Sequence, residues 1–497
     1  MKSKLIKISD SKNQVLIDIL HIISESERWY SLKEIASAIN LSDRSSQRYV
    51  NQLYDIVISY NNEKKNFFSL LMKKNHGIKL LINSQANVEF LVNYILEEDE
   101  NIKLLTALLF KDYETMVDYA NQNFLCTYSI NQACIKCNNI LSLFSLKIDK
   151  KNFELNGSES NIRIFIYNFC WSLYNSESWP ECFEIVSCHE VESDILYLTE
   201  ALSIPIINPI KLKKIMYCLT IFLIRCNKKK IVLSENLRRN VPIYMNESDN
   251  PVLIDIVSNI FNKHSIYNQD EIYSFILYLL CGSGIYRSPY IKRNILEYHN
   301  KINSEVFQAT ILFFNIFQKN ISMISEEDFD TSFEFIFRSH LKVSMYLELN
   351  IEFEKTYFSD DTLDNYVIYS NKMKEIIEMM KNQQDLILFK EVIYLSQRYI
   401  MLFLSLDFQK NYNKLISIKL DTDYPSVYED FIKKYIRDYF KYDYNLIFID
   451  NNYYQKPDLI LNSLPESYLY EQRVINITYP ICDRDLEKIQ IILDDLK

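Results

Sequence analysis

The chain has 497 residues and a net charge of −10, and 48% of its residues are hydrophobic. A chain of this length and apolar content is expected to form roughly three to five domains, which excludes a disordered protein. Its four glycines disfavour glycine-rich phosphate loops and favour helices. The apolar runs are too short or too charged to span a bilayer, and no signal peptide is visible. We therefore expect a cytoplasmic protein that does not enter the membrane.

The cysteines lack the spacing of a disulfide framework. Cys134 and Cys137 lie three residues apart in a helical pattern, with no second pair and no nearby histidine. We interpret them as core thiols rather than zinc ligands. No P-loop, metal-ligand cluster or catalytic triad is visible, so we expect neither an enzyme nor a bound metal or other cofactor.

The N-terminal segment has the spacing of a helix-turn-helix motif. Apolar residues over 13–27 recur on one face of a helix. Ser31 followed by Glu34 is the pattern of a capping box, and it predicts the start of a second helix. After a short turn, Ser42 predicts the start of a third helix, whose inward residues would be Val50, Leu53, Tyr54 and Val57.

Two strand-like runs follow the third helix, at residues 67–73 and 78–82. They flank the segment Asn75-His76-Gly77, which is typical of a hairpin turn. A hairpin directly after a helix-turn-helix is the wing of a winged helix-turn-helix domain. We therefore predict such a domain over residues 1–83.

The third helix would carry a polar face with residues spaced three to four apart. Arginine and amide side chains form paired hydrogen bonds with guanine and adenine edges, and serines near a helix start can reach phosphates. Residues 1–83 also contain 13 Lys and Arg against eight Asp and Glu, although a solvated helix face would be polar too. We predict DNA contacts from Lys33, Arg44, Ser45, Ser46, Gln47, Arg48 and Asn51.

A second, similar unit is predicted over residues 84–160. Helical patterns at 86–97, 101–110, 113–123 and 129–143 precede two short strand-like runs, 146–149 and 152–155. This unit has a net excess of acidic residues, so its role in DNA binding is a weaker prediction. Its possible contacts are Asn131, Gln132 and Lys136.

The rest of the chain changes character once. Residues 160–400 are almost continuously helical in pattern, as two blocks that meet near Gly282-Ser283-Gly284. From about residue 412, four short buried strands alternate with two helices, which predicts a small α/β domain with a mostly parallel sheet. The fold class is therefore mainly α and multidomain, with an α/β C-terminus.

This order of parts resembles the Mga/AtxA family of Gram-positive global regulators. The resemblance is carried by LSDRSSQRYVNQL in the first unit, FELNGSESNIRIFIY at 153–167 and RSHLKVSMYL at 338–347. It implies a second helix-turn-helix over 84–160, phosphotransferase-system (PTS) regulatory domains over 161–284 and 285–406, and a domain similar to a sugar-permease IIB subunit over 407–497. It also implies a transcription regulator of the global or virulence type, acting as an activator, that forms a homodimer through its C-terminal region.

The resemblance further implies regulation by histidine phosphorylation. His340 corresponds to a phosphate acceptor from the phosphocarrier protein HPr or another PTS component, with His189, His264 and His299 as weaker candidates. Two positions depart from the family pattern, because Leu347 replaces an arginine and Cys218 replaces a histidine. The first strand of the IIB-like domain is followed by Asp421 and Thr422 without the catalytic cysteine of such subunits, and Cys482 lies elsewhere. We therefore interpret that domain as a non-catalytic dimerisation or docking module.

Two other functions compete with the DNA-binding regulator. An RNA-binding antiterminator under PTS control would share the regulatory domains, but such proteins begin with a small β-rich domain rather than with capped helices. A phosphoryl-transfer enzyme would need a cluster of catalytic groups, whereas the histidines here are scattered. The prediction remains a regulator that binds promoter DNA.

Overall fold

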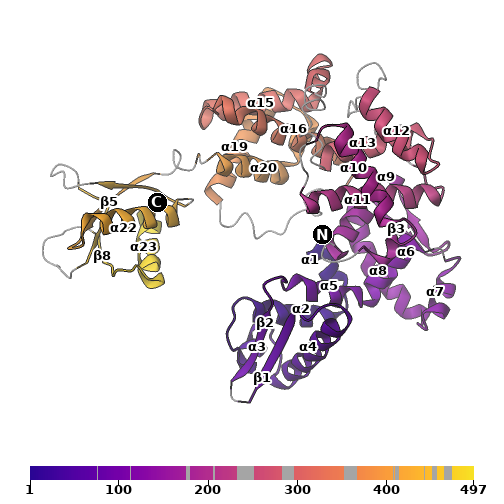
Figure 1. Ribbon diagram of the computed structural model, residues 1–497, viewed down its shortest axis with the longest axis horizontal. Helices are drawn as coiled ribbons and strands as arrows, with labels where there is room; N and C mark the ends of the chain where they lie inside the picture. Colours follow the sequence, from indigo (N-terminus) through magenta and orange to yellow (C-terminus); the bar gives the residue numbers. More distant parts are fainter. Residues whose placement is uncertain are drawn as a thin grey trace. The chain divides into compact units, whose positions relative to one another are not determined.

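The computed structural model describes the chain except residues 75, 112, 175–178, 205–207, 232–250, 283–295, 352–366, 407, 409–413, 442, 450–455, 464–472 and 497. Helices dominate the described residues, and the sheets are small (Figure 1). The predicted fold class, mainly α with an α/β C-terminus, is confirmed. The chain divides into two compact units, residues 1–308 with 338–362, and residues 309–337 with 363–497. The predicted boundary at 284/285 lies outside the described residues.

The first 83 residues contain the predicted helices and hairpin. Ser31 caps its helix through the predicted capping box: its Oγ accepts from the Glu34 amide at 3.2 Å, and its amide donates to Glu34 Oε2 at 2.7 Å. Ser42 Oγ likewise accepts from the Ser45 amide at 3.3 Å. Each such cap stabilises a helix by about 1 kcal/mol. The elements are α2 (Ser11–Ser24), α3 (Leu32–Ala38), α4 (Asp43–Glu63), β1 (Phe68–Lys73) and β2 (Gly77–Ile82).

The inward side of α4 is a narrow stripe of residues spaced three to four apart. Val50, Leu53 and Val57 are buried, as predicted. Tyr54 was predicted to face inward and is instead 37% exposed. The position is one residue beyond Leu53, which rotates its side chain about 100° away from the stripe.

The wing is joined to the helices by a close backbone contact at Gly77. The backbone of Tyr30 exchanges hydrogen bonds with Ile78, at 2.8 and 2.9 Å. Gly77 has a φ of +101°, and a Cβ there would lie 2.1 Å from the Tyr30 carbonyl oxygen. Only glycine therefore fits this position.

We expect Gly77→Ala to lower the free energy of unfolding by about 1–3 kcal/mol, because the strained φ and the clash with Tyr30 act together. Urea unfolding of the full chain measures the change. Ser69→Ala, at an exposed position of β1, is the control and should stay within about 0.5 kcal/mol of the wild type. Equal unfolding midpoints for the two variants would contradict the structural role of Gly77.

The second predicted helix-turn-helix unit, residues 84–160, has its helices and strands in the predicted order, with boundaries shifted by a few residues. One helix at the N-terminus of the chain was not predicted. That helix, α1 (Lys2–Ile8), packs on α2 of the first unit as well as on α8 and α9. Asp99 joins the two units, since its carboxylate caps α6 and also accepts from the Asp10 amide at 2.7 Å. The elements are α5 (Glu89–Glu97), α6 (Glu100–Phe110), α7 (Met116–Gln122), α8 (Thr127–Leu141), β3 (Lys147–Asp149) and β4 (Glu154–Asn156).

The central region is helical, as predicted. Among the described residues, no helix combines the length and the apolarity that crossing a bilayer requires. The first helices of the central region are α9 (Glu159–Tyr174), α10 (Cys188–Ala201), α11 (Pro209–Asn227), α12 (Pro251–Lys263) and α13 (Gln269–Gly282). They are followed by α15 (Glu305–Asn320), α16 (Glu326–Glu348), α19 (Val367–Gln383) and α20 (Val392–Ser405).

The C-terminal region is a four-stranded sheet in the order β6-β5-β7-β8 with every neighbouring pair parallel. Buried aliphatic residues of the sheet pack against Ile432 and Ile436 of one helix and Leu486 and Ile489 of another. The predicted parallel α/β arrangement is confirmed. Its elements are β5 (Leu415–Asp421), α22 (Ser426–Phe440), β6 (Asn445–Ile449), β7 (Leu459–Asn462), β8 (Val474–Asn476) and α23 (Asp483–Leu496).

Candidate nucleic-acid interface

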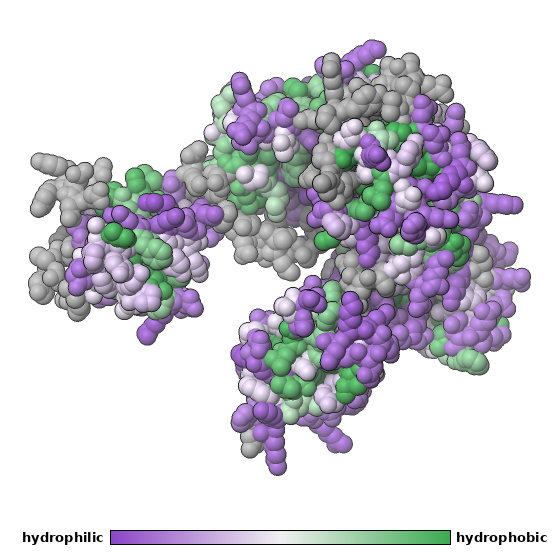
Figure 2. Space-filling view, viewed as in Figure 1, coloured by the Kyte–Doolittle hydropathy of each residue, from purple (hydrophilic) through white to green (hydrophobic). Residues whose placement is uncertain are grey.

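The outward face of α4 carries the four long polar side chains that the sequence singles out. Arg44, Gln47, Arg48 and Asn51 are all exposed. Gln47 Nε2 donates to Asn51 Oδ1 at 2.9 Å, so these two amides are aligned along the helix. Figure 2 shows mostly hydrophilic residues along this edge of the first unit. The face projects groups that suit base edges, on a helix whose opposite side is held in the core.

The remaining predicted contacts differ in their accessibility. Lys33 is exposed in the first turn of α3, and Ser45 is partly exposed beside the N-terminus of α4. Ser46 is completely buried, and its Oγ donates to the Ser42 carbonyl oxygen at 3.1 Å. Its expected DNA contact does not fit this position, because residue 46 lies on the same stripe as Val50. Sequence spacing alone did not separate Ser45 from Ser46.

The wing adds positive charge that the sequence analysis did not use. Lys73 and Lys74 are exposed at the hairpin end, next to exposed His76. Lys73 Nζ lies 5.5 Å from the centroid of the Trp29 ring, and the same ring meets His76 edge-on. Two consecutive lysines, Lys73 and Lys74, beside the predicted hairpin turn are the sequence signal that could have indicated a basic wing. A basic wing next to a polar helix suits the phosphate backbone that flanks a groove.

The candidate contacts in the second unit are partly engaged within the protein. Gln132 is exposed on α8. Asn131 Oδ1 accepts from Lys150 Nζ at 2.9 Å, which links the helix to the β3–β4 turn. Lys136 Nζ lies 3.1 Å from Asp10 Oδ1. This ion pair gives Lys136 a partner in the first unit, so its role is at least partly to join the two units.

The histidine selected by the resemblance is inaccessible. His340 lies on α16 and is completely buried, and burial lowers the pKa of its imidazole to about 3. The imidazole is therefore neutral, which is the form that attacks a phosphoryl group. A phosphocarrier can reach it only if the surroundings of α16 open.

The three weaker histidine candidates have different environments. His299 is 4% exposed, and burial lowers its pKa to about 4. His264 Nε2 lies 2.7 Å from Asp194 Oδ2, a pairing that orients the ring. His189 is exposed at the start of α10. The described residues contain no group of three or more side chains placed to hold a metal ion.

Comparison with known proteins shows that part of the chain matches a known domain family. Residues 84–170 match the Mga helix-turn-helix domain. The resemblance to the Mga/AtxA regulators is confirmed. The match covers the second unit and the first three quarters of α9. The helix-turn-helix that characterises the Mga family is therefore the unit for which the sequence pattern was weaker.

Three regulators from Bacillus anthracis are similar to parts of this chain. The chain is 25% identical over 287 residues to the anthrax toxin expression trans-acting positive regulator, covering 56% of each chain. It is 21% identical over 332 residues to the capsule synthesis positive regulator AcpB, covering 64% of each. A further match, to AcpA, is 23% identical and covers 33% of this chain and 32% of that one. The chain thus matches less than two thirds of the length of these relatives.

Proposed function

We propose that this protein is a DNA-binding transcription regulator that reads promoter DNA in the bacterial cytoplasm, and that it acts as an activator. The observation that carries the proposal is the exposed face of Arg44, Gln47, Arg48 and Asn51 on α4, the third helix of a winged helix-turn-helix. The Mga domain match and the relatives named as positive regulators support it. Base contacts would come from α4 and phosphate contacts from Lys33, Ser45 and the wing.

The second unit contributes to the same interface in this proposal. Gln132 on α8 and Lys151 at the β3–β4 turn are two of its exposed polar groups. Because residues 84–160 carry more acidic than basic side chains, their share of the electrostatic attraction to DNA is smaller. We expect substitutions there to weaken DNA binding less than substitutions on α4.

The deciding experiment is a binding titration of the full chain with a duplex promoter fragment and with a hairpin RNA of equal length. We expect tighter binding to the duplex, with an affinity that falls steeply as salt rises. Preference for the hairpin RNA would favour the antiterminator. An antiterminator would share the regulatory region with this chain. The N-terminus of this chain, however, is built of capped helices rather than a small β-rich domain.

We also propose a homodimer formed through α22 of the C-terminal region. Four apolar residues spaced four apart form an exposed stripe on this helix, while its other side packs into the domain core. The rings of Phe431 and Tyr435 are stacked, with centroids 6.3 Å apart. A two-fold axis would place the same stripe of a second copy against it. The stripe consists of Val427, Phe431, Tyr435 and Tyr439, which are 75%, 56%, 39% and 54% exposed.

We expect Phe431→Glu combined with Tyr435→Glu to convert the dimer into monomer, because four carboxylates would face one another across the axis without partners. Light scattering at micromolar concentration measures the mass. The matched control is Gln490→Glu with Ile491→Glu on α23, at two exposed positions, which should leave the dimer intact. A wild-type protein that is monomeric under these conditions would contradict the proposal.

Control by the phosphotransferase system remains a prediction that rests on the resemblance. His340 is the residue it selects, and its burial requires that the phosphocarrier meets an opened form of the protein. Mass spectrometry after incubation with phosphorylated HPr would locate any modified histidine. Label on exposed His189 alone would move the site away from α16.

A further inference from the structure

A pocket in the first compact unit lies between the Mga helix-turn-helix domain and the helices that follow it in the chain. Its volume is about 850 Å³, and its walls come from α6, β4, the N-terminus of α9 and the C-terminal end of α11 with the residues after it. This volume is in the range of pockets that hold small molecules. A ligand here would contact residues on both sides of the junction.

The lining of this pocket is basic, although the whole chain is acidic. It contains five basic and two acidic side chains, in a protein whose net charge is −10. The basic residues are Lys111, Arg225, Lys228, Lys229 and Lys230, and the acidic residues are Glu154 and Glu159. An excess of one sign in a concave surface focuses the electrostatic field and attracts ions of the opposite sign.

Both acidic side chains are already paired. Glu159 accepts two hydrogen bonds from Arg225, at 2.7 and 2.8 Å. Glu154 lies 3.2 Å from Lys230 Nζ. No carboxylate of the described residues lies within ion-pair distance of Lys111 or Lys229. Lys228 Nζ donates to the Phe110 carbonyl oxygen at 3.0 Å. Among the described residues, Lys111 and Lys229 therefore carry charge in the lining that no neighbouring carboxylate offsets.

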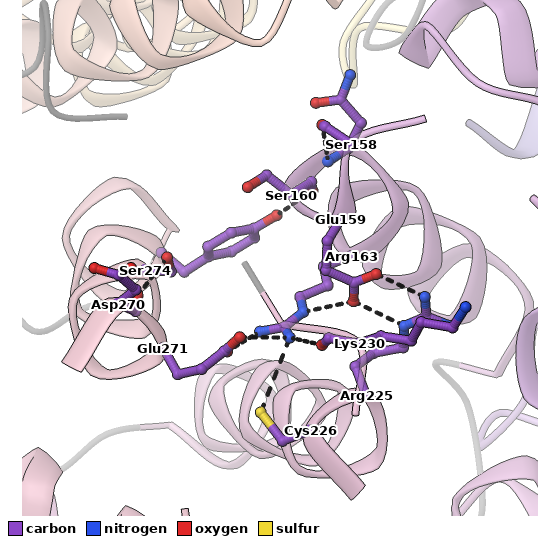
Figure 3. A network of polar contacts seen from close by, with 12 residues as sticks. Ser158, Glu159, Ser160, Arg163, Arg225, Cys226, Lys230, Asp270, Glu271 and Ser274 are labelled. Atoms are coloured by element: carbon purple, nitrogen blue, oxygen red, sulfur yellow. Dashed lines mark hydrogen bonds and ion pairs between the residues drawn. The ribbon is translucent and has the colours of Figure 1, made fainter. Parts of the chain in front are cut away.

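The backbone segment that carries Lys229 and Lys230 is fixed by buried contacts of Arg163. Arg163 is completely buried, and it contacts the carboxylates of Glu159 and Glu271 (Figure 3). Its Nη2 also donates to the Lys230 carbonyl oxygen at 2.9 Å. Lys229 lies two residues beyond the end of α11 and has a φ of +56°. Because these contacts fix the backbone of residues 229 and 230, the charged rim of the pocket is preformed and would lose little freedom on binding a ligand.

Hydrogen-bond donors at the start of α9 also line the pocket. Ser158 Oγ accepts from the Asn161 amide at 3.2 Å at the start of α9, which leaves its hydroxyl proton available to a ligand. Ser158, Ser160 and the first turn of α9 all line the pocket. Amides at a helix N-terminus add partial positive charge on this side. Lysines together with hydroxyl and amide donors in one pocket are groups that bind an anion.

We propose that this pocket binds a small, multiply charged anion bearing phosphate or carboxylate groups. Lys111 and Lys229 supply the charge, and the α9 N-terminus supplies the hydrogen bonds. The proposal goes beyond DNA binding and does not depend on it, because α4 and the wing take no part in the pocket.

The test is isothermal titration calorimetry of the full chain with inorganic pyrophosphate and with citrate at matched ionic strength. We expect one site for at least one of these anions, with affinity about tenfold or more weaker in Lys111→Gln/Lys229→Gln. Pyrophosphate binding alone would assign the phosphate class, and citrate binding alone the carboxylate class. The control is Lys211→Gln/Lys301→Gln, which removes the same charge at exposed lysines outside the pocket and should bind as the wild type does.

A second measurement on the unmodified chain keeps the proposal testable if the lysine variant does not fold. The anion that binds should protect Lys111 and Lys229 from an amine-reactive acetylating reagent, and it should leave Lys211 and Lys301 unprotected. The proposal is overturned if neither anion binds at millimolar concentration, if the pocket variant binds with wild-type affinity, or if protection is equal at all four lysines. No DNA is present in either measurement, so their failure is distinguishable from failure of DNA binding.

Discussion

Replacing Arg44 and Arg48 together by alanine should weaken binding to the target duplex by about thirtyfold or more. Each arginine that forms a paired hydrogen bond with a guanine edge is worth about 1–3 kcal/mol. Both guanidinium groups are exposed on α4 and have their helix backbone held by the buried stripe of Val50 and Leu53. The loss should therefore come from the interface and not from the fold. A fluorescence anisotropy titration with a labelled promoter fragment measures it.

Two matched variants separate base reading from general attraction. Lys372→Ala/Lys381→Ala on α19 removes the same charge far along the chain and should leave the affinity nearly unchanged. Arg44→Lys/Arg48→Lys keeps the charge but cannot form the paired contact, so it should retain binding to unrelated DNA and lose the preference for the target. Unaltered affinity in the alanine variant would remove α4 as the reading helix. The two α4 variants should unfold within about 0.5 kcal/mol of the wild type, because Arg44 and Arg48 are exposed.

The second large effect concerns the stability of the junction behind the lysine-lined pocket. Arg163→Met should lower the free energy of unfolding by about 3–5 kcal/mol, because it removes the guanidinium that pairs with the buried carboxylate of Glu271. The two side chains are 0% and 1% exposed. Burial alone would lower the pKa of Arg163, but hydrogen bonds from its guanidinium to Glu271 and the charge of that carboxylate raise the pKa above its usual value.

Urea unfolding of the full chain provides the measurement, and two further variants provide the comparison. Lys103→Met breaks an exposed ion pair, in which Lys103 Nζ lies 2.9 Å from Glu98, and should cost only about 0–1 kcal/mol. Arg163→Met/Glu271→Leu removes both buried charges and should regain part of the loss. If Arg163→Met costs no more than Lys103→Met, the ion pair does not stabilise the junction.

Much of the local structure of this protein could be predicted from the sequence. The capping box of Ser31 and Glu34, the turn before Ser42 and the hairpin around Gly77 all appear where the pattern indicates. The C-terminal strands and helices do so as well, including their parallel pairing. The caps, the turn and the hairpin depend on residues that are close to one another in the chain, so a single sequence carries their signal. The parallel pairing was indicated instead by the alternation of strands and helices. The exposed face of α4 belongs to the same group, because helical spacing alone puts Arg44 and Arg48 on one side.

Contacts between distant segments could not be predicted in this way. Nothing near Arg163 in the chain indicates that its partner is Glu271, which lies 108 residues away. Likewise, Ser46 and Ser45 look alike in sequence, and only the packing of α4 buries one of them and exposes the other. His340 is polar in sequence but lies in a core. Burial and ion pairing depend on which surfaces meet, and that information is spread over the whole folded chain rather than held in any one segment.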